Sequence, residues 1–296
     1  VSMDHKEKYY RQDLGQVWTY DEYGRYINAH WDWVHLPFDD DFTQPNRLLH
    51  YTVEKPVKES SIVEVGSAMG QGFHFLKSTG IIDTSDYTGI EVSDKGVAKA
   101  RERFPEVNWI QADFTKYELT RNYDYGFERH SIHHMPEPVE QMKKILEHIN
   151  ISFCTTFRGF IEEGTISDLD KSYFENLGKG FVYSNFISVS EIVNIALKEG
   201  FNHIRILYWG KHEPIATDHN GHQYMDPGLL NQRDYARYTV RFTKYPELKR
   251  PLVYCVLAGK LGGLKRWLEG PRGVIRIKNH IHRFQSKAQI AKLASV

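Results

Sequence analysis

The sequence predicts an α/β fold in which a mostly parallel sheet is covered by helices on both faces. From residue 62 onward, short apolar runs typical of strands alternate with runs in which apolar residues recur at helical spacing. This alternation is typical of parallel sheets, because each connecting helix packs back onto one face of the sheet. The expected strands cover residues 62–65, 87–92, 107–111, 123–128, 149–155, 203–208 and 252–257. The expected helices cover residues 72–78, 94–104, 138–147 and 190–199, the last with Ser190 as its N-cap and Gly200 after its end.

The first expected strand runs into a glycine turn. Residues 61–72 read Ser-Ile-Val-Glu-Val-Gly-Ser-Ala-Met-Gly-Gln-Gly, and a helical pattern follows them. A glycine turn between a strand and a helix lets backbone N–H groups approach a ligand closely. The glycines are spaced G-x-x-x-G-x-G, whereas a dinucleotide fingerprint requires G-x-G-x-x-G. The turn therefore predicts a small-molecule site that differs from the usual dinucleotide site.

Length and composition indicate a folded protein rather than a disordered or membrane-spanning one. The chain has 296 residues, zero formal net charge and 14 % aromatic residues. No apolar run approaches the ~20 residues that span a bilayer, and no secretory signal is visible. The two cysteines, Cys154 and Cys255, each lie in an apolar run, as expected of reduced thiols. We therefore expect a cytoplasmic protein.

The chain divides into three regions. We expect an aromatic-rich helical cap over residues 1–50, a central domain over 51–258 and a basic helical tail over 259–296. The central domain carries insertions at 158–188 and 209–250, both much longer than the usual ~2–6-residue connections. Long loops beside a site often act as lids or substrate surfaces, so we expect both insertions to contact the substrate.

The C-terminal tail carries a strong positive charge. Residues 257–296 hold nine lysines and arginines but only one acid, Glu269, so the rest of the chain is acidic. Apolar residues interleave with the basic ones. The tail is therefore compatible with an interfacial helix on an anionic membrane, with an anionic acceptor, or with a solvated helix on the acidic body. No nucleic-acid module is visible, so we expect no nucleic-acid partner.

The glycine turn resembles the first motif of class I methyltransferases that use S-adenosylmethionine. That motif usually reads E/D-x-G-x-G-x-G, and here Glu64, Gly66 and Gly70 match it while Ala68 replaces the middle glycine. The resemblance implies a Rossmann-like, doubly wound sheet of seven strands whose last strand is antiparallel. In that arrangement the strand at 252–257 would be antiparallel, and Cys154 and Cys255 would lie on neighbouring strands.

The resemblance also implies where the cofactor binds. Glu91 closes the second strand, 25 residues after Gly66, and would accept hydrogen bonds from the ribose hydroxyls. Asp113 would accept from the adenine amino group, and Phe114 would flank the ring. Glu128 would place a second acid near the sulfonium. The full set of expected cofactor-binding residues is Glu64, Gly66, Ser67, Ala68, Gly70, Gly72, Glu91, Val92, Asp113, Phe114, Glu128 and Arg129.

Histidines follow the fourth expected strand. In residues 123–138, Asp124, His133, His134 and Pro138 match the family pattern at this place. An enzyme of this family needs a base only when the acceptor is a hydroxyl or a protonated amine, and histidine suits that role. His130 and His133 are the candidate catalytic residues, whereas we expect His134 to support the loop.

These observations predict an S-adenosylmethionine-dependent methyltransferase that acts on an O or N atom of a small molecule or saccharide by direct displacement. Alignment of the reacting atoms can supply ~7–11 kcal/mol in such reactions. Two alternatives remain: a non-catalytic cofactor-binding scaffold or peripheral membrane adaptor, and a Rossmann enzyme that uses NAD or a nucleotide sugar. Residues 212–226 hold three histidines and three acids, but their spacing favours an acceptor-contacting lid over a metal site.

Overall fold

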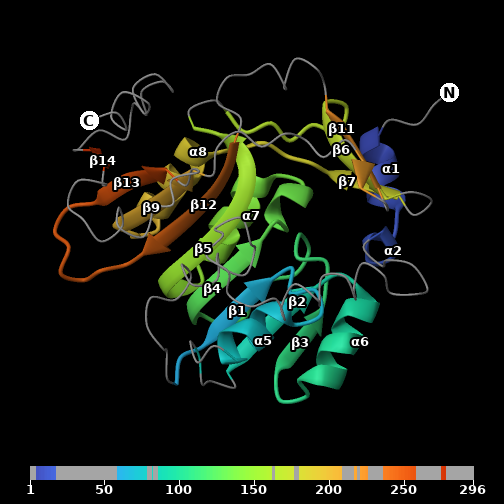
Figure 1. Ribbon diagram of the computed structural model, residues 1–296, viewed down its shortest axis with the longest axis horizontal. Helices are drawn as coiled ribbons and strands as arrows, with labels where there is room; N and C mark the ends of the chain where they lie inside the picture. The colour runs from blue at the N-terminus through green and yellow to red at the C-terminus, as the bar shows by residue number, and fades with distance from the viewer. Residues whose placement is uncertain are drawn as a thin grey trace.

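The computed structural model contains a large mixed sheet and a smaller antiparallel sheet, with helices packed around the large one (Figure 1). Residues 174, 176, 208, 217–218, 221–225, 237, 254–257 and 275–277 are described through their backbone only. The structure describes residues 5–17, 59–78, 82, 86–161, 164–176, 180–208, 217–218, 221–225, 236–257 and 275–277.

The large sheet has the order β14-β13-β9-β12-β5-β4-β1-β2-β3, and β8 pairs with the end of β5. All pairings from β3 to β5 are parallel, which confirms the predicted doubly wound core. The strands are β1 (Ile62–Val65), β2 (Tyr87–Glu91), β3 (Asn108–Gln111), β4 (Tyr123–Arg129), β5 (Ile149–Phe160), β8 (Ile187–Ser188), β9 (His203–Tyr208), β12 (Ala236–Thr243), β13 (Leu252–Leu257) and β14 (Ile275–Ile277).

Inside the large sheet the antiparallel strand is β12, which lies between β5 and β9 and runs opposite to both, and at the edge β14 runs opposite to β13. The prediction that residues 252–257 form it is wrong, because β13 pairs in parallel with the outer edge of β9. Cys154 on β5 and Cys255 on β13 are therefore separated by β12 and β9 and do not lie on neighbouring strands. In β12, buried apolar residues alternate with arginine and threonine, so the strand does not appear as an apolar run.

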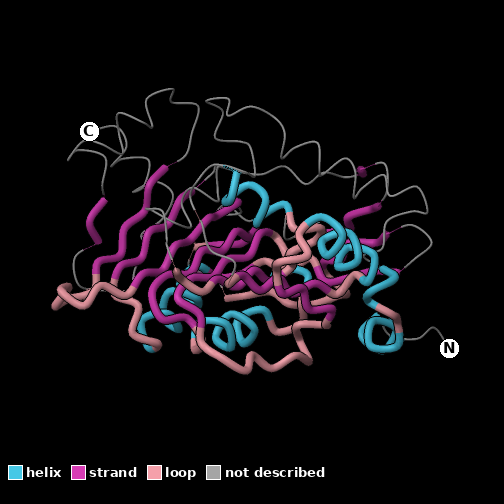
Figure 2. The backbone as a smooth tube through the Cα atoms, turned by 90° about the horizontal axis from the view of Figure 1, so that it is seen from below, coloured by secondary structure: helices cyan, strands magenta, loops and turns pink. Residues whose placement is uncertain are grey.

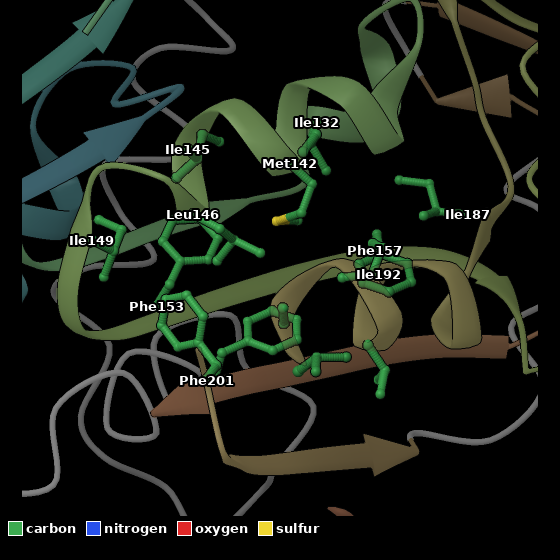
Figure 3. Close-up of a cluster of buried hydrophobic side chains, with 14 of the residues drawn as sticks. Ile132, Met142, Ile145, Leu146, Ile149, Phe153, Phe157, Ile187, Ile192 and Phe201 are labelled. Atoms are coloured by element: carbon green, nitrogen blue, oxygen red, sulfur yellow. The ribbon is translucent and has the colours of Figure 1, made fainter. Parts of the chain in front are cut away.

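Four helices cover the two faces of the sheet. They are α5 (Gln71–Ser78), α6 (Asp94–Arg103), α7 (Pro138–Leu146) and α8 (Val189–Lys198). Helices α7 and α8 pack on β5 and β12 through a large apolar cluster, part of which Figure 3 shows, including Met142, Ile145, Phe153 and Ile192. Helices α5 and α6 pack on the strands from β1 to β3 through a second cluster. Each buried large apolar side chain contributes roughly 1.5–3 kcal/mol, so these clusters hold the strand ends in place.

The ends of α8 differ in part from the prediction. Ser188, rather than Ser190, is its N-cap, and the Ser188 Oγ accepts a hydrogen bond from the backbone N–H of Glu191 at 3.3 Å. Ser190 lies within the first turn of the helix. Gly200 takes a left-handed φ of 85° directly after the helix, which confirms the predicted stop.

The two insertions contribute to one smaller sheet. Its strands are β6 (Ser172–Asn176), β7 (Gly180–Tyr183), β10 (Thr217–Asp218) and β11 (Gly221–Met225), in the order β10-β11-β6-β7. Strand β11, from the second insertion, is antiparallel to β6, from the first. About 40 residues of sequence lie between β6 and β11. The two insertions nevertheless form a single structural unit, which we call the inserted sheet.

The N-terminal helices α1 (His5–Arg11) and α2 (Leu14–Val17) pack against β7 at the same end of the molecule (Figures 1 and 2). The Gln12 side chain donates to the carbonyl of Phe181 and accepts from its N–H at 3.1 Å. Residues 18–50 of the predicted cap, and residues 259–296 of the predicted tail apart from β14, lie outside the described residues. Within the described part of the chain, no helix is long and apolar enough to cross a membrane.

Candidate active site

The turn after β1 consists largely of left-handed backbone. Gly66, Ala68 and Gly70 have φ values of 72°, 48° and 80°. The N–H groups of Gly66 and Ser67 both donate to the carbonyl of Ile90, at 2.8 and 3.1 Å. A Cβ on Gly66 would lie 2.4 Å from the Cβ of Ser131, so a larger residue does not fit. Ala68 adopts the left-handed geometry itself at a cost of about 1–2 kcal/mol, so it preserves the turn that a middle glycine would form.

Glu91 holds this turn from the end of β2. Its Oε2 accepts from the backbone N–H of Ala68 at 2.9 Å, and its Oε1 accepts from the N–H of Ser93 at 2.9 Å. Burial raises the pKa of the Glu91 carboxyl, and these backbone hydrogen bonds oppose the rise. Each carboxylate oxygen still has acceptor capacity for a ribose hydroxyl. Val92 follows Glu91, and a Cβ built on Gly15 of α2 would lie 3.1 Å from the Val92 carbonyl oxygen. Helix α2 therefore lies beside the end of β2.

Glu64 lies beneath the turn and is fully buried. Its Oε2 accepts from the hydroxyl of Tyr87 at 2.6 Å, and its Oε1 lies 3.7 Å from Nη2 of Arg129. A Cβ on Gly72 would lie 2.4 Å from Oε1, so the bare Cα of Gly72 makes room for the carboxylate. Burial raises the pKa of Glu64 to about 7, although Arg129 and Tyr87 oppose the rise. These contacts place Glu64 as a support of the glycine turn, and its contact with the cofactor stays a prediction.

Asp113 and Phe114 follow β3 at the same edge of the sheet. The Asp113 Oδ1 accepts from the N–H and the hydroxyl of Thr115, at 3.1 and 2.7 Å, and its Oδ2 lies 3.2 Å from Nζ of Lys116. Phe114 is buried in the large apolar cluster, with Nζ of Lys144 4.8 Å from its ring centre. Asp113 thus caps its own turn, and contact of both residues with adenine stays a prediction.

The carboxylate of Glu128 is surrounded by donors of the protein. Its Oε2 accepts from the N–H of Ser131 at 2.9 Å, from the Ser131 hydroxyl at 2.9 Å and from the N–H of Ile132 at 3.2 Å. Its Oε1 accepts from the hydroxyl of Thr155 and from the N–H of Thr156 at 3.1 Å. Glu128 therefore anchors residues 130–134, which we call the histidine turn, to β5. The sequence did not predict this role, and contact of Glu128 with a cofactor stays a prediction.

The histidines lie together in this turn. His130 has a left-handed φ of 59°, and its ring centre lies 5.4 Å from that of His133, which is buried. The ring of His133 lies 4.0 Å from that of His134. Because Ser131 contacts Gly66, the turn adjoins the glycine turn. The structure therefore brings both candidate bases beside the expected cofactor site.

His134 supports the loop, as expected. Its Nδ1 lies 2.7 Å from the carbonyl of Tyr183 and donates its proton to it, which joins the turn to the inserted sheet. Burial and the nearby charge of Arg158 lower the pKa of His134 to about 3, so its ring is neutral.

Residues of the first insertion complete the site, and the sequence analysis did not single them out. The N–H of Asn185 donates to the carbonyl of His133 at 2.7 Å, and its side-chain amide donates to the carbonyl of Met135. Arg158, near the end of β5, donates to the hydroxyl of Ser184 at 3.0 Å. Because all these contacts span more than 20 residues of sequence, no local pattern reveals them.

Comparison with known proteins finds one matching family model and several similar solved structures. Residues 62–150 match the family model of a methyltransferase domain. The structure is similar to phosphoethanolamine N-methyltransferase 2 of Haemonchus contortus in complex with S-adenosyl-L-methionine, with 17 % sequence identity and a TM-score of 0.50 over 79 % of this chain and 59 % of that one. The same enzyme in complex with phosphomonomethylethanolamine and S-adenosylhomocysteine aligns with 16 % identity and a TM-score of 0.46, covering 72 % and 56 % of the two chains.

A third similar structure is the complex of DhpI with S-adenosylhomocysteine, with 14 % identity and a TM-score of 0.46 over 80 % of this chain and 99 % of that one. This chain spans less than two thirds of the length of the Haemonchus enzyme. Residues 62–150 therefore match a methyltransferase domain, and the fold is similar to that of an enzyme solved with S-adenosyl-L-methionine, as expected of class I. The predicted class is therefore confirmed.

Proposed function

We propose that this chain transfers the methyl group of S-adenosylmethionine to an O or N atom of a small molecule or saccharide. The observation that carries the proposal is the left-handed turn at residues 66–70, which Glu91 holds beside the turn containing His130 and His133. The first turn offers bare backbone at a strand end, and the second offers titratable groups next to it. Together they supply a cofactor cradle and a candidate base within one edge of the sheet.

The proposed mechanism rests mainly on alignment. Bound S-adenosylmethionine supplies a methyl group that its sulfonium already activates. The glycine turn at residues 66–70 would border the amino acid end of the cofactor, although the N–H groups of Gly66, Ser67 and Ala68 already donate within the protein. Glu91 would accept hydrogen bonds from the ribose hydroxyls, and Asp113 would accept one from the adenine amino group. Glu64, which packs against Gly72, fixes the position of the turn relative to the start of α5. Holding two reactants in line contributes ~7–11 kcal/mol in favourable cases.

His130 and His133 serve as bases when the acceptor has a proton to lose. A hydroxyl or an ammonium group requires that loss, and a positioned histidine accelerates it by about 10²–10⁴-fold. His134 takes no part in this step, since burial and the charge of Arg158 lower its pKa to about 3 and make it a weak base.

Calorimetry with S-adenosylhomocysteine tests the cofactor site. We expect the wild-type chain to bind it and a Gly66→Arg variant to lose binding, because the new side chain collides with Ser131. A Gly200→Asn variant is the matched control: it also replaces a left-handed glycine, but nothing lies within 4 Å of the position. Absence of binding by a folded wild-type chain would contradict the proposal. Release of S-adenosylhomocysteine in the presence of O- and N-nucleophiles then identifies the transferred-to atom.

Contact of the basic tail with an anionic surface, and a location in the cytoplasm or at its membranes, belong to the same proposal. Both concern residues that lie mostly outside the described part of the chain. Cosedimentation with vesicles that contain phosphatidylserine tests the contact, with a chain that lacks residues 258–296 as the comparison. Equal binding of both chains would remove the tail as the anchor.

A further inference from the structure

Arg158 is a buried cation that has no carboxylate partner among the residues that the structure describes. Only 9 % of the residue is exposed, and one of its guanidinium nitrogens donates to the hydroxyl of Ser184 at 3.0 Å. No acid among the described residues forms an ion pair with it, whereas Arg129 of the neighbouring strand lies 3.7 Å from the carboxylate of Glu64. One neutral hydroxyl satisfies one of five N–H donors and leaves the charge uncompensated.

A largely buried charge with no opposite charge beside it is costly to a fold. None of the Arg158 nitrogens is both buried and without a hydrogen-bond partner, so the rest of the guanidinium remains accessible to a ligand. Proteins keep such a group where a ligand supplies the missing charge. The planar guanidinium matches carboxylate and phosphate groups, since its parallel N–H bonds reach two oxygens at once. The chemistry of Arg158 therefore calls for an oxyanion.

The position of Arg158 lies beside the candidate bases. Thr156, two residues earlier on the same face of β5, is the register partner of Arg129 at the end of β4. Arg158 donates to the hydroxyl of Ser184, and the N–H of the next residue, Asn185, donates to the carbonyl of His133, whose ring lies 4.0 Å from that of His134. Arg158 is thus linked to His133 through Ser184 and Asn185, at the edge of the sheet where the acceptor must approach.

The acids near this place are already engaged. Glu128 accepts hydrogen bonds from four residues of the chain, and Glu64 is paired with Tyr87 and Arg129. Glu137 and Asp168 act on the hydroxyl of Tyr183 and form no ion pair with Arg158. None of these described acids therefore offsets the charge of Arg158.

We propose that Arg158 binds an oxyanion group, carboxylate or phosphate, of the methyl acceptor, while Ser184 orients the guanidinium. This inference deepens the proposed function and rests on it. It makes the acceptor an anionic small molecule or an acidic saccharide rather than a neutral one. Because Ser184 belongs to the first insertion, that insertion then takes part directly in acceptor recognition.

Titration of the full chain, saturated with S-adenosylhomocysteine, tests the inference. Inorganic phosphate and acetate are the two probes, and calorimetry measures their binding. We expect saturable binding of at least one probe, with affinity at least tenfold weaker in Arg158→Gln, which corresponds to about 1.4 kcal/mol. Ser184→Ala, which removes the hydrogen bond but keeps the charge, should stay within threefold of the wild type. Arg121→Gln, at an exposed arginine paired with Asp86, should not change binding.

The probe that binds distinguishes a phosphate-bearing acceptor from a carboxylate-bearing one. Binding of neither probe to the wild type, or equal binding by Arg158→Gln, would overturn the inference. Should Arg158→Gln fail to fold, Arg158→Lys replaces it and is expected to bind the anion more weakly, because a lysine offers no planar pair of donors. If the chain binds S-adenosylhomocysteine but anion binding does not depend on Arg158, this inference fails and the proposed function stands. If the chain binds neither S-adenosylhomocysteine nor the anion, the proposed function fails as well.

Discussion

The Oε2 atom of Glu91 accepts a hydrogen bond from the backbone N–H of Ala68 at 2.9 Å. The carboxylate that closes β2 therefore holds the turn that follows β1, directly beside it in the sheet. Ala68 is the residue that departs from the family motif, and its left-handed φ of 48° shows that the departure leaves the turn intact. The geometry of the turn and the proposed recognition of the ribose thus depend on one side chain.

Replacement of Glu91 should affect both stability and cofactor binding. In Glu91→Ala the N–H groups of Ala68 and Ser93 lose their acceptor, so we expect a loss of about 1–3 kcal/mol in the free energy of unfolding. Affinity for S-adenosylhomocysteine should fall at least about tenfold, because hydrogen bonds to a charged group contribute ~1.5–3 kcal/mol. Urea unfolding and calorimetry measure the two effects. Glu102→Ala, at an exposed acid on α6, is the control and should change neither.

Ala68→Gly should stabilise the chain. Glycine relieves a left-handed backbone cost of about 1–2 kcal/mol, and its greater freedom in the unfolded chain returns about 0.4–1 kcal/mol. We therefore expect a net gain of roughly 0.5–1 kcal/mol in the free energy of unfolding. The same substitution at Ala100, inside helix α6, should instead cost about 1 kcal/mol. A destabilised Ala68→Gly variant would show that the alanine methyl group contributes packing that outweighs the strain.

The buried carboxyl of Glu64 should make stability depend on pH. Its folded pKa of about 7 lies above its unfolded value of 4.5, so between these values the folded chain binds the extra proton. Stability from this group is therefore greatest below pH 4.5, falls as pH rises towards 7 and is constant above that, a change of up to about 3 kcal/mol. Relative to wild type, Glu64→Gln should become more stable between pH 5 and pH 8 in urea unfolding. A difference that stays constant across this range would contradict the assignment.

Replacement of Glu128 should affect the stability of the histidine turn more than the affinity for the cofactor. Glu128→Ala leaves the donors of Ser131, Ile132, Thr155 and Thr156 without their acceptor, so we expect about 2–4 kcal/mol lower stability. The milder Glu128→Gln should lower kcat because the turn is held less firmly. Its affinities for charged S-adenosylmethionine and neutral S-adenosylhomocysteine should change by the same factor. A selective loss of S-adenosylmethionine would instead support the predicted contact with the sulfonium.

The candidate bases and their neighbour should behave differently. His130→Gln and His133→Gln should lower kcat about 10²–10⁴-fold at most for an acceptor that must lose a proton, with little change in S-adenosylhomocysteine binding. His134→Phe should mainly lower stability by about 1–3 kcal/mol, because the carbonyl of Tyr183 loses its donor. Product formation over a pH series and urea unfolding separate the two outcomes. Turnover that is undiminished in both histidine variants would show that neither His130 nor His133 acts as a base and that the site contributes by aligning the reactants.

The geometry of the glycine turn and of the strand ends beside it was largely predictable from the sequence. Strand β1, the glycine turn and the residue that closes β2 lie within 30 residues of one another, and their positions follow from strand ends and glycine geometry. The role of Glu128 was not predictable, because its donors Thr155 and Thr156 belong to the next strand. Strand β12 did carry a signal, the alternation of apolar residues with arginine and threonine, but it lies inside a long insertion.

The sequence by itself determined the class of fold and the cofactor cradle. Hydrophobic periodicity and glycine conformation act over a few residues, and therefore the chain order alone reveals them. Only the tertiary structure decided that two distant insertions form one sheet and that this part of the chain is joined to His133 and His134. It also decided that Arg158 is buried with no acid of the described residues paired to it. Strand pairing and burial depend on contacts between segments far apart in the chain, and no local pattern encodes which segments meet.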